Sequence, residues 1–436
     1  MGVGAGAECR SAALCPANVG PVRALVFDPS SRRLPWVGAA SRIRPDWALG
    51  PGSLLSLRDL AEPLAPGPEW VRLRVIWSGI CGSDVKEVLL QAAADNPLSG
   101  LVSFPHVPGH EVVARVEDPG SLSPLRAGDR VALDPWVGCV ARGRESLCPA
   151  CARGFPPHCH HQPDGGPWGA GHGLHLGNIS GLPGGFAEVI YAHPSQCHRL
   201  PDHLDPRLGV LADPLAVGLH AVDRAGAEPA GPILVLGAGT IGLSLTLAVR
   251  QRWPQLPVLV TAAWPHQLGL ISALGAEPLP VAASAVVPEL ARRTGGRLVR
   301  PWRGGSWSLG SGVELVLDSI GSSVTAELAL RCLAPRGRIV VVGVTKPART
   351  ENTLAYYKEA EIVGSNGYGR SSAGASAPHQ LDQALTILAE RAKELSRWCT
   401  HSFPLGSYRA AFALANHPDR GSAIKVSLRL AEEDAR

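Results

Sequence analysis

The sequence has little that would place it in a specialised class of protein. It has no run of basic residues, and 41 Lys and Arg against 37 Asp and Glu leave a formal net charge of only +4. Such a weak and dispersed charge offers nucleic acid little to bind, so we expect no nucleic-acid partner. Charged residues make up 18% of the chain and apolar residues 45%, which excludes a coiled coil, a collagen or a disordered chain and leaves ample material for a buried core.

Targeting and membrane patterns are also missing. The first twenty residues hold no apolar stretch behind a basic one, so we expect no secretory signal. The uncharged window 229–249 contains Gly237, Gly239, Gly242 and two prolines, and it is better explained as strand, turn and helix than as a membrane span. Ten cysteines without a signal favour a reducing compartment and metal or catalytic use. We therefore expect a cytoplasmic protein with no membrane partner.

The first half of the chain has short β-type runs between turn signals. Residues 1–21 resemble a flexible tail, and the Pro-, Ser- and Arg-rich residues 28–68 resemble an irregular surface insertion. The β-type runs lie at 22–27, 70–77, 111–117, 129–133 and 185–192. Because no helices separate them, they predict a small antiparallel β domain.

The second half changes character near residue 208. A helix over 208–225 is followed by apolar runs that alternate with helical stretches, at 233–236, 258–261, 313–318, 338–344 and 360–365. This alternation predicts an α/β fold, a doubly wound parallel sheet covered on both faces. A helix over 378–398 and a strand over 423–428 end the chain, and we expect them to pack back on the first domain.

A glycine-rich turn lies where such a sheet binds a dinucleotide. Gly237, Gly239 and Gly242 form the pattern GxGxxG directly after the run 233–236. The first Gly allows a tight turn, the second lets a pyrophosphate approach the backbone, and the third lets helix and strand pack closely. Free N–H groups at the helix start attract the phosphates, so we expect Thr240 and Ile241 to contact NAD or NADP. The alternative is an ordinary turn in a Gly-rich chain.

The choice between NAD and NADP stays open. In NAD-binding proteins the GxGxxG pattern is followed, about 20 positions on, by an acidic residue that binds the adenosine ribose. Ala262 stands at that position, and no Arg follows at once to hold a 2′-phosphate.

Two sets of residues could hold metal ions. Four cysteines within 21 residues could form the closed, tetrahedral thiolate site that structural Zn²⁺ favours, although free thiols, or a histidine next to the last cysteine replacing one ligand, are alternatives: Cys139, Cys148, Cys151 and Cys159. A scattered second set, Cys81, His110 and Asp213, offers a thiolate, an imidazole and a carboxylate with an open fourth position, the layout of a catalytic zinc. Spacing alone leaves a buried thiol, a core histidine and a helix N-cap as the alternatives.

At these residues the chain resembles the zinc-dependent medium-chain dehydrogenase/reductase family, nearest to its threonine and polyol dehydrogenase branch. The resemblance covers most of residues 70–428 and rests on the order of nine segments: SGICGSD (78–84), PGHEVVARV (108–116), AGDRVAL (127–133), CPACARGFPPHC (148–159), GGFAEVIYAH (184–193), LADPLAVGLHAV (211–222), LVLGAGTIG (234–242), LVLDSIG (315–321) and RGRIVVVGV (336–344).

The resemblance implies a domain organisation and a partner. A GroES-like catalytic domain would span residues 22–214, with a zinc lobe at about 139–159, and residues 368–436 would complete it. A Rossmann domain at 215–367 would bind NAD or NADP, with the active site in the cleft between the two. A small-molecule alcohol or ketone would be the substrate, and the chain would form a homodimer or homotetramer.

The resemblance also implies residue roles. Cys81 and His110 would bind the catalytic zinc, Glu111 would be a carboxylate able to approach it, Asp213 would be the further ligand, and Ser83 would relay the substrate's proton. The four cysteines of the lobe match structural-zinc ligands. Residues near the nicotinamide would be Ser319, Gly343 and Val344, where plain turn geometry is the alternative.

Three departures from the family pattern bear on these roles. The first gap in the lobe is eight residues instead of two, so Cys139 is the least secure of its ligands. Val85 and Lys86 follow Asp84 where relatives often have a relay histidine, so the proton may leave by another route. The acidic residue missing at Ala262 is the third departure.

The implied reaction is oxidation of a secondary alcohol of polyol, sugar or amino-alcohol type, or the reverse reduction of a ketone. Zinc would act as a Lewis acid and hydride would pass to NAD(P)⁺. Two alternatives are a zinc-free NADPH-dependent reductase of an activated double bond and a non-catalytic nucleotide-binding protein on the same fold. The retained Cys81, His110 and Asp213 argue against both, because a chain that had lost zinc chemistry should have lost its ligands first.

Overall fold

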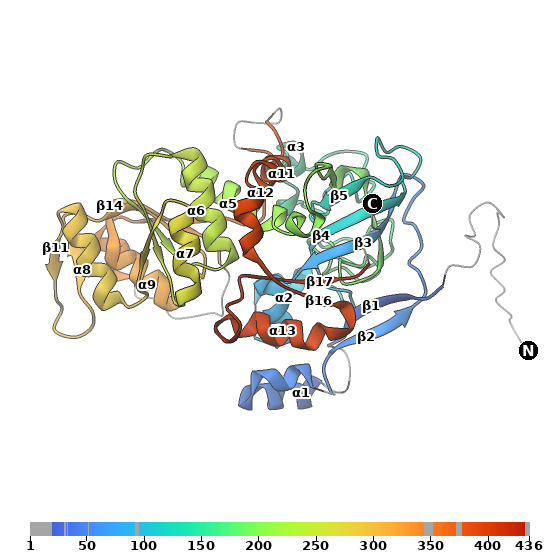
Figure 1. The fold of residues 1–436 in the computed structure, drawn as a ribbon, viewed down its shortest axis with the longest axis horizontal. Helices are drawn as coiled ribbons and strands as arrows, with labels where there is room; N and C mark the ends of the chain where they lie inside the picture. Colours follow the sequence, from blue (N-terminus) through green and yellow to red (C-terminus); the bar gives the residue numbers. More distant parts are fainter. Residues whose placement is uncertain are drawn as a thin grey trace, which may run out of the picture.

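The structure is a computed structural model that describes residues 20–29, 32, 34–50, 52–91, 96–343, 352–371 and 377–431. Val344 and nearly all of the expected N-terminal tail lie outside these residues. Two sheets organise the chain, one rich in antiparallel pairs and one wholly parallel. They lie toward opposite ends of the molecule, with α5 (Ala212–Ala225), α11 (Gln380–Glu390) and α12 (Ala392–Leu395) between them (Figure 1).

The first sheet has seven strands, in the order β16-β17-β3-β4-β5-β7, with β6 paired to β3. Strand β17 pairs antiparallel with β3, which confirms that the C-terminal segment packs back on the first domain. Short helices accompany the sheet: α2 (Gly82–Val88), α3 (Pro149–Ala152), α4 (Pro206–Gly209) and α13 (Tyr408–Asn416). Its strands are β3 (Val71–Gly79), β4 (Glu111–Asp118), β5 (Arg130–Leu133), β6 (Val189–Ala192), β7 (Cys197–Arg199), β16 (Cys399–Pro404) and β17 (Lys425–Arg429).

The second sheet has six parallel strands in the order β10-β9-β8-β13-β14-β15. Along β8, Ile233 and Val235 join the core that contains α5, α6 and α11, whereas Leu234 and Leu236 join the core that contains α8 and α9. This alternation confirms a parallel sheet covered on both faces. Its elements are β8 (Ile233–Leu236), α6 (Thr240–Arg252), β9 (Val258–Thr261), α7 (Pro265–Ala273), β10 (Glu277–Leu279), α8 (Ala283–Thr294), β13 (Val313–Asp318), α9 (Ser323–Cys332), β14 (Leu333–Val341), α10 (Thr353–Tyr357) and β15 (Glu361–Gly364).

The expectation of an irregular insertion at 28–68 is wrong. This region contains α1 (Leu34–Ile43) and β2 (Leu55–Leu60), and β2 pairs antiparallel with β1 (Val22–Phe27) along its whole length. Half of the residues of β2 are exposed, so it shows no apolar run in the sequence, and it depends on its partner strand for its place. The helix expected over 378–398 is also divided, because α11 ends before Arg391 and α12 begins after it.

A short hairpin, β11 (Arg297–Val299) with β12 (Trp307–Leu309), was not predicted either. Within the described part of the chain, no helix combines the length and the apolar character needed to cross a membrane.

Candidate active site

Cys81, His110 and Glu111 meet at one end of the paired strands β3 and β4. One possible ligand atom from each lies within 4.8 Å of the other two. The strand register explains the meeting: Gly79 at the end of β3 stands opposite Glu111 at the start of β4. Cys81 follows β3 closely and His110 directly precedes β4, so an antiparallel pair brings a thiol and an imidazole 29 positions apart in the chain to the same edge.

Glu111 is buried and held by a cation that is distant in the sequence. Lys425 at the start of β17 places its Nζ 2.7 and 2.6 Å from the two carboxylate oxygens, and both side chains are almost fully buried. The carboxylate fits only because residue 79 is glycine, since a Cβ there would lie 1.9 Å from Glu111 Oε2. The backbone of β3 thus forms a space shaped for this carboxylate.

His110 is oriented by Asp84 in the first turn of α2. Its Nδ1 lies 3.5 Å from Asp84 Oδ1, and the other carboxylate oxygen accepts the backbone N–H of Cys81 at 2.8 Å. Burial alone would raise the pKa of Asp84, but the charge of His110 and the hydrogen bonds from His110 and Cys81 hold that pKa below its usual value. Asp84 therefore stays a carboxylate that fixes the imidazole, as carboxylates commonly do for metal-binding histidines.

Asp213 lies near this group but is engaged elsewhere. It stands in the first turn of α5, and its Oδ1 accepts a hydrogen bond from the Tyr368 hydroxyl at 2.7 Å. Burial raises the pKa of Asp213 to about 6, and the charge of Glu111 adds to the rise. The group within 4.8 Å comprises Cys81, His110 and Glu111 without Asp213, so its role as a ligand stays a prediction. Ser83 is exposed in the first turn of α2.

The donor set fits zinc. A thiolate, an imidazole and a carboxylate are the ligands that Zn²⁺ takes in catalytic sites, where three protein ligands leave a fourth position open. Cys81 and Glu111 both line a cavity of about 360 Å³, so the open side of the group faces a space that a substrate can enter.

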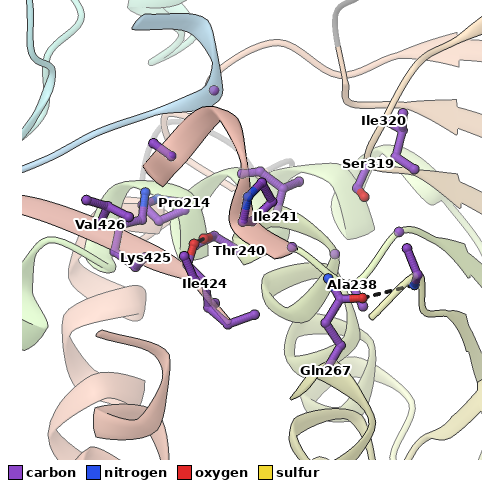
Figure 2. A pocket seen from close by; sticks show the side chains of 18 of the residues that line it. Pro214, Ala238, Thr240, Ile241, Gln267, Ser319, Ile320, Ile424, Lys425 and Val426 are labelled. Carbon is purple, nitrogen blue, oxygen red and sulfur yellow. Dashed lines mark hydrogen bonds between the residues drawn. The ribbon is translucent and has the colours of Figure 1, made fainter. Parts of the chain in front are cut away.

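The same cavity contains the glycine-rich turn. All of residues 237–242 line it, including the predicted Gly237, Gly239, Thr240, Ile241 and Gly242. Figure 2 shows Ala238 of the glycine-rich turn, Thr240 at the start of α6 and Ser319 after β13 around a space that Ile424, Lys425 and Val426, at the start of β17, also border. The Thr240 hydroxyl donates to the carbonyl of Ile424 at 3.0 Å and so joins the two domains beside the cavity.

Gly237 is required for the shape of this turn. Its φ is +95°, and a Cβ would lie 2.6 Å from Ser319 Oγ. Ser319 lines the cavity, as predicted for a residue near the cofactor. Gly343 packs against the turn that follows β13, since a Cβ on it would lie 2.3 Å from the backbone of Ile320, but it is not among the described residues that line the cavity.

The adenosine side of the cavity carries no acidic side chain. At the end of β9, Thr261 uses its hydroxyl to accept the N–H of Gly237, and Gln267 accepts the N–H groups of Ala263 and Trp264. Of the described residues that line the cavity, only Glu111 is acidic and only Lys425 is basic, and both belong to the metal end. The described lining thus has neither a second carboxylate that could hold the ribose of NAD nor an Arg that could hold the 2′-phosphate of NADP, as the sequence indicated.

The four cysteines of the lobe also come together, with one sulfur from each within 4.8 Å of the others: Cys139, Cys148, Cys151 and Cys159. The Sγ atoms of Cys139 and Cys159 are 3.7 Å apart, close to the edge of about 3.8 Å expected for sulfurs at ~2.3 Å from one tetrahedral zinc. Backbone N–H groups point at the sulfurs, as from Cys148 to Cys139 at 3.3 Å. The cluster fits a closed zinc site.

The long gap in the lobe contains a buried arginine. Arg142, three residues after Cys139, donates to the carbonyls of Val137, Asp164 and Gly173 at 3.1, 2.7 and 2.5 Å. These bonds tie Arg142 to residues outside the gap. Backbone N–H groups of Gly143 and Arg144 donate to the carbonyls of Val140 and Cys139, both at 3.0 Å, and fold the chain back after Cys139.

Four residues of the site were not assigned a role from the sequence. Asp84 has a local signal, because it lies three residues after Cys81. Lys425 and Tyr368 have none, since each reaches its partner across more than 150 residues. His175, from the loop 158–182, packs its ring 5.0 Å from that of His110, and burial lowers the pKa of His175 to about 3.

Family models match both halves of the chain. Residues 67–202 match the alcohol dehydrogenase GroES-like domain, and residues 254–390 match the zinc-binding dehydrogenase domain. The chain belongs to the zinc-dependent medium-chain dehydrogenase family. It is accordingly an NAD(P)-dependent, zinc-binding alcohol dehydrogenase, and the resemblance and the fold class predicted from the sequence are confirmed.

Relatives that match this chain include dehydrogenases named for L-idonate and sorbitol. The chain is 28% identical over 370 residues to L-idonate 5-dehydrogenase of Vitis vinifera, covering 84% of this chain and 89% of that protein. It is 28% identical over 391 residues to sorbitol dehydrogenase of Homo sapiens, covering 88% and 95%. An alcohol dehydrogenase of Escherichia coli CFT073 solved with NADH superimposes with a TM-score of 0.67 at 20% identity, over 94% of this chain and 100% of that one, which shows a shared fold.

Proposed function

We propose that this dehydrogenase oxidises a secondary alcohol group of a polyol-type substrate with NAD(P)⁺, and reduces the matching ketone in reverse. The observation that carries the proposal is the single cavity of about 360 Å³ that both Cys81 with Glu111 and the turn 237–242 line. A metal-bound alcohol and a nicotinamide would meet there in one shared space, which hydride transfer requires.

The residues divide the work between two ends of the cavity. Zn²⁺ bound by Cys81, His110 and Glu111 would supply a Lewis acid that lowers the pKa of an alcohol, and NAD(P)⁺ would supply the hydride acceptor. Asp84 fixes the His110 ring, and Lys425 neutralises part of the charge of Glu111. The turn 237–242 and the start of α6 offer N–H groups to the pyrophosphate.

Proton release is the task we propose for Ser83. Ser83 stands two residues after Cys81 and is an exposed residue, so a proton passed to its hydroxyl would have water nearby to receive it. Asp213, held by Tyr368, is proposed as the further carboxylate near the metal. We also propose that the nicotinamide side of the cofactor is contacted by Ser319, Gly343 and Val344. The four cysteines of the lobe are proposed as the ligands of a structural zinc.

The substrate class rests on the relatives. Proteins named for sorbitol and L-idonate match this chain over most of its length, and both are polyhydroxy compounds with secondary alcohols. We also propose that residues 22–214 and 368–436 form the catalytic domain and that residues 215–367 form the cofactor-binding domain.

We further propose a cytoplasmic homodimer or homotetramer. Strand β15 ends the parallel sheet, and Ile362 on it and the nearby Tyr356 are 56% and 86% exposed. An exposed apolar edge of this kind is a surface that a second copy can cover. Size-exclusion chromatography with light scattering would test the assembly, and a monomer at high concentration would contradict it.

A substrate panel tests the proposed reaction. The full chain, purified with zinc present, should reduce NAD⁺ or NADP⁺ with at least one of sorbitol, L-idonate and simple secondary alcohols, and a chelator should abolish the turnover. Cofactor binding followed by Trp fluorescence would survive the chelator. Zinc-loaded protein that binds the cofactor and turns over no member of the panel in either direction would contradict the proposal.

A further inference from the structure

A third group of metal-binding side chains lies away from both sites described above. Asp134 follows β5, His198 lies in β7, and His379 is the residue before α11. One possible ligand atom from each lies within 4.8 Å of the other two. Strands β5 and β7 pair, whereas His379 comes from the helix that packs between the two sheets, so the group joins segments that lie 181 positions apart in the chain (Figure 1).

His198 already has the arrangement of a metal-binding histidine. Its Nδ1 lies 2.7 Å from Asp382 Oδ1, and its Nε2 is buried without a hydrogen-bond partner among the residues that the structure describes. Carboxylates that bind one nitrogen of a histidine commonly fix the other as a metal ligand. A buried nitrogen lone pair without a partner is costly, and a cation would satisfy it.

Asp134 and His379 stand at the spacing of two ligands of one ion. Asp134 Oδ2 is 3.4 Å from His379 Nε2, and their side chains are only 5% and 14% exposed. A charged hydrogen bond would be shorter, at about 2.7–2.9 Å. Nitrogen and oxygen ligands ~2.1 Å from a tetrahedral zinc lie about 3.4 Å apart. The other Asp134 oxygen accepts the N–H of Trp136 at 3.1 Å, which holds the carboxylate in place.

One existing contact opposes a metal here. His379 Nδ1 accepts the N–H of Leu381 at 3.3 Å as part of the α11 N-cap. A metal on Nε2 needs the ring proton on Nδ1, so this bond would be lost. It is a long bond, and the start of α11 keeps a further anchor, because Gln380 donates to Asp223 of α5 at 2.9 Å.

We propose that Asp134, His198 and His379 form a third, structural site for Zn²⁺ or a similar divalent transition metal. Two imidazoles and a carboxylate are a ligand set that these ions favour over Mg²⁺ or Ca²⁺. The ion ties the start of α11 to the β5–β7 edge and so fixes the helix between the two sheets. The ring of Tyr368, whose hydroxyl donates to Asp213, is 6.0 Å from that of His379, so the ion also steadies the contact between Tyr368 and Asp213.

Metal content tests the site independently of the proposed reaction. The full-length variants His198→Asn and His379→Asn are equilibrated with buffered Zn²⁺ beside the wild type, and zinc per chain is measured. Asn at 379 keeps a good N-cap while removing the imidazole. The exposed His203 gives the matched control His203→Asn. Each of the two variants should hold about one zinc fewer than the wild type, and the control should hold as many as the wild type.

Equal zinc content in the wild type and both variants would overturn the proposal, whatever the other two sites contain. Asp382→Asn should weaken rather than abolish the site, lowering zinc affinity about 10- to 100-fold. If a histidine variant does not fold, a zinc-edge anomalous map of the wild type decides instead. A peak between the three side chains is expected, and a blank map at this position with zinc in the crystal would refute the site.

Discussion

The Cys81, His110 and Glu111 group and the four-cysteine lobe differ in the origin of their ligands and in their surroundings. The lobe draws all four sulfurs from residues 139–159, and its own backbone N–H groups donate to them. The other group takes three different ligand types from the ends of the paired strands β3 and β4 and the residues beside them, and it depends on Lys425, 314 residues away from Glu111. The lobe cysteines are absent from the lining of the described cavity, whereas Cys81 and Glu111 border it.

This contrast separates a site that holds a fold from a site that performs chemistry. A closed set of like ligands leaves no position for a substrate, whereas three mixed ligands beside a cavity leave one open. The lobe should therefore matter for stability, and the Cys81 group for turnover. Variants in the two groups test whether stability and turnover depend on different sites.

The largest effect on turnover is expected from Cys81→Ser. Loss of the thiolate removes a metal ligand beside the cavity, and turnover should fall about 10³-fold or more, because metal stabilisation of developing charge contributes several kcal/mol. Cofactor binding, measured by fluorescence titration, should change little. The half-buried Cys197, outside both groups, supplies the control Cys197→Ser. Turnover near the wild-type rate in the Cys81 variant would contradict the assignment of the chemistry to the Cys81 group.

Gly79→Ala should have the next largest effect. The new methyl group would lie 1.9 Å from Glu111 Oε2, so the carboxylate must leave its place. Zinc affinity at this site should fall about 10- to 100-fold, as for other changes that misorient a ligand, and turnover should fall with it. Gly231, where a Cβ meets nothing within 4 Å, gives the control Gly231→Ala. Equal zinc retention in the two variants would show that Glu111 does not depend on this space.

Tyr368→Phe should lower turnover by about tenfold or less. It removes the hydroxyl that donates to the buried Asp213 and leaves that carboxyl without this partner, at a cost of about 1–3 kcal/mol in stability. The exposed Tyr356 provides the control Tyr356→Phe. Denaturant unfolding together with steady-state kinetics would measure both effects, and unchanged values for both would exclude a positioning role for Tyr368.

Cys148→Ser should change turnover least and stability most. With one lobe sulfur lost, the structural zinc should bind weakly, and the melting temperature should fall by about 5 °C or more. Turnover per folded molecule at low temperature should stay within about threefold of the wild type. Scanning calorimetry and activity on the same sample would test this. A variant that keeps its melting temperature but loses turnover would reverse the roles assigned to the two sites.

Local sequence patterns predicted those parts of the fold that depend on local residues. The bounds of β8, β9 and β13 match the predicted runs, because strands buried on both faces are mostly apolar. Strand β2 was missed, since half of its residues are exposed and it depends on β1. The four lobe cysteines were predicted from their spacing, but the contacts of Arg142 in the long gap were not, because its three partners are backbone carbonyls.

The candidate site was predictable only where a motif marks it. Cys81, His110 and the glycine turn lie in recognisable segments, whereas the salt bridge from Lys425 and the bond from Tyr368 to Asp213 arise only when distant strands and helices pack. No short window of sequence contains both partners of either contact.

Zinc-edge anomalous scattering from crystals of the full chain grown with NAD(H) tests the central claim most directly. We expect a strong peak for a zinc ion bound to Cys81 Sγ, a His110 nitrogen and a Glu111 oxygen, with the nicotinamide ring in the adjoining cavity. A map that shows zinc among the lobe cysteines but none at Cys81, although cofactor is bound, would contradict it.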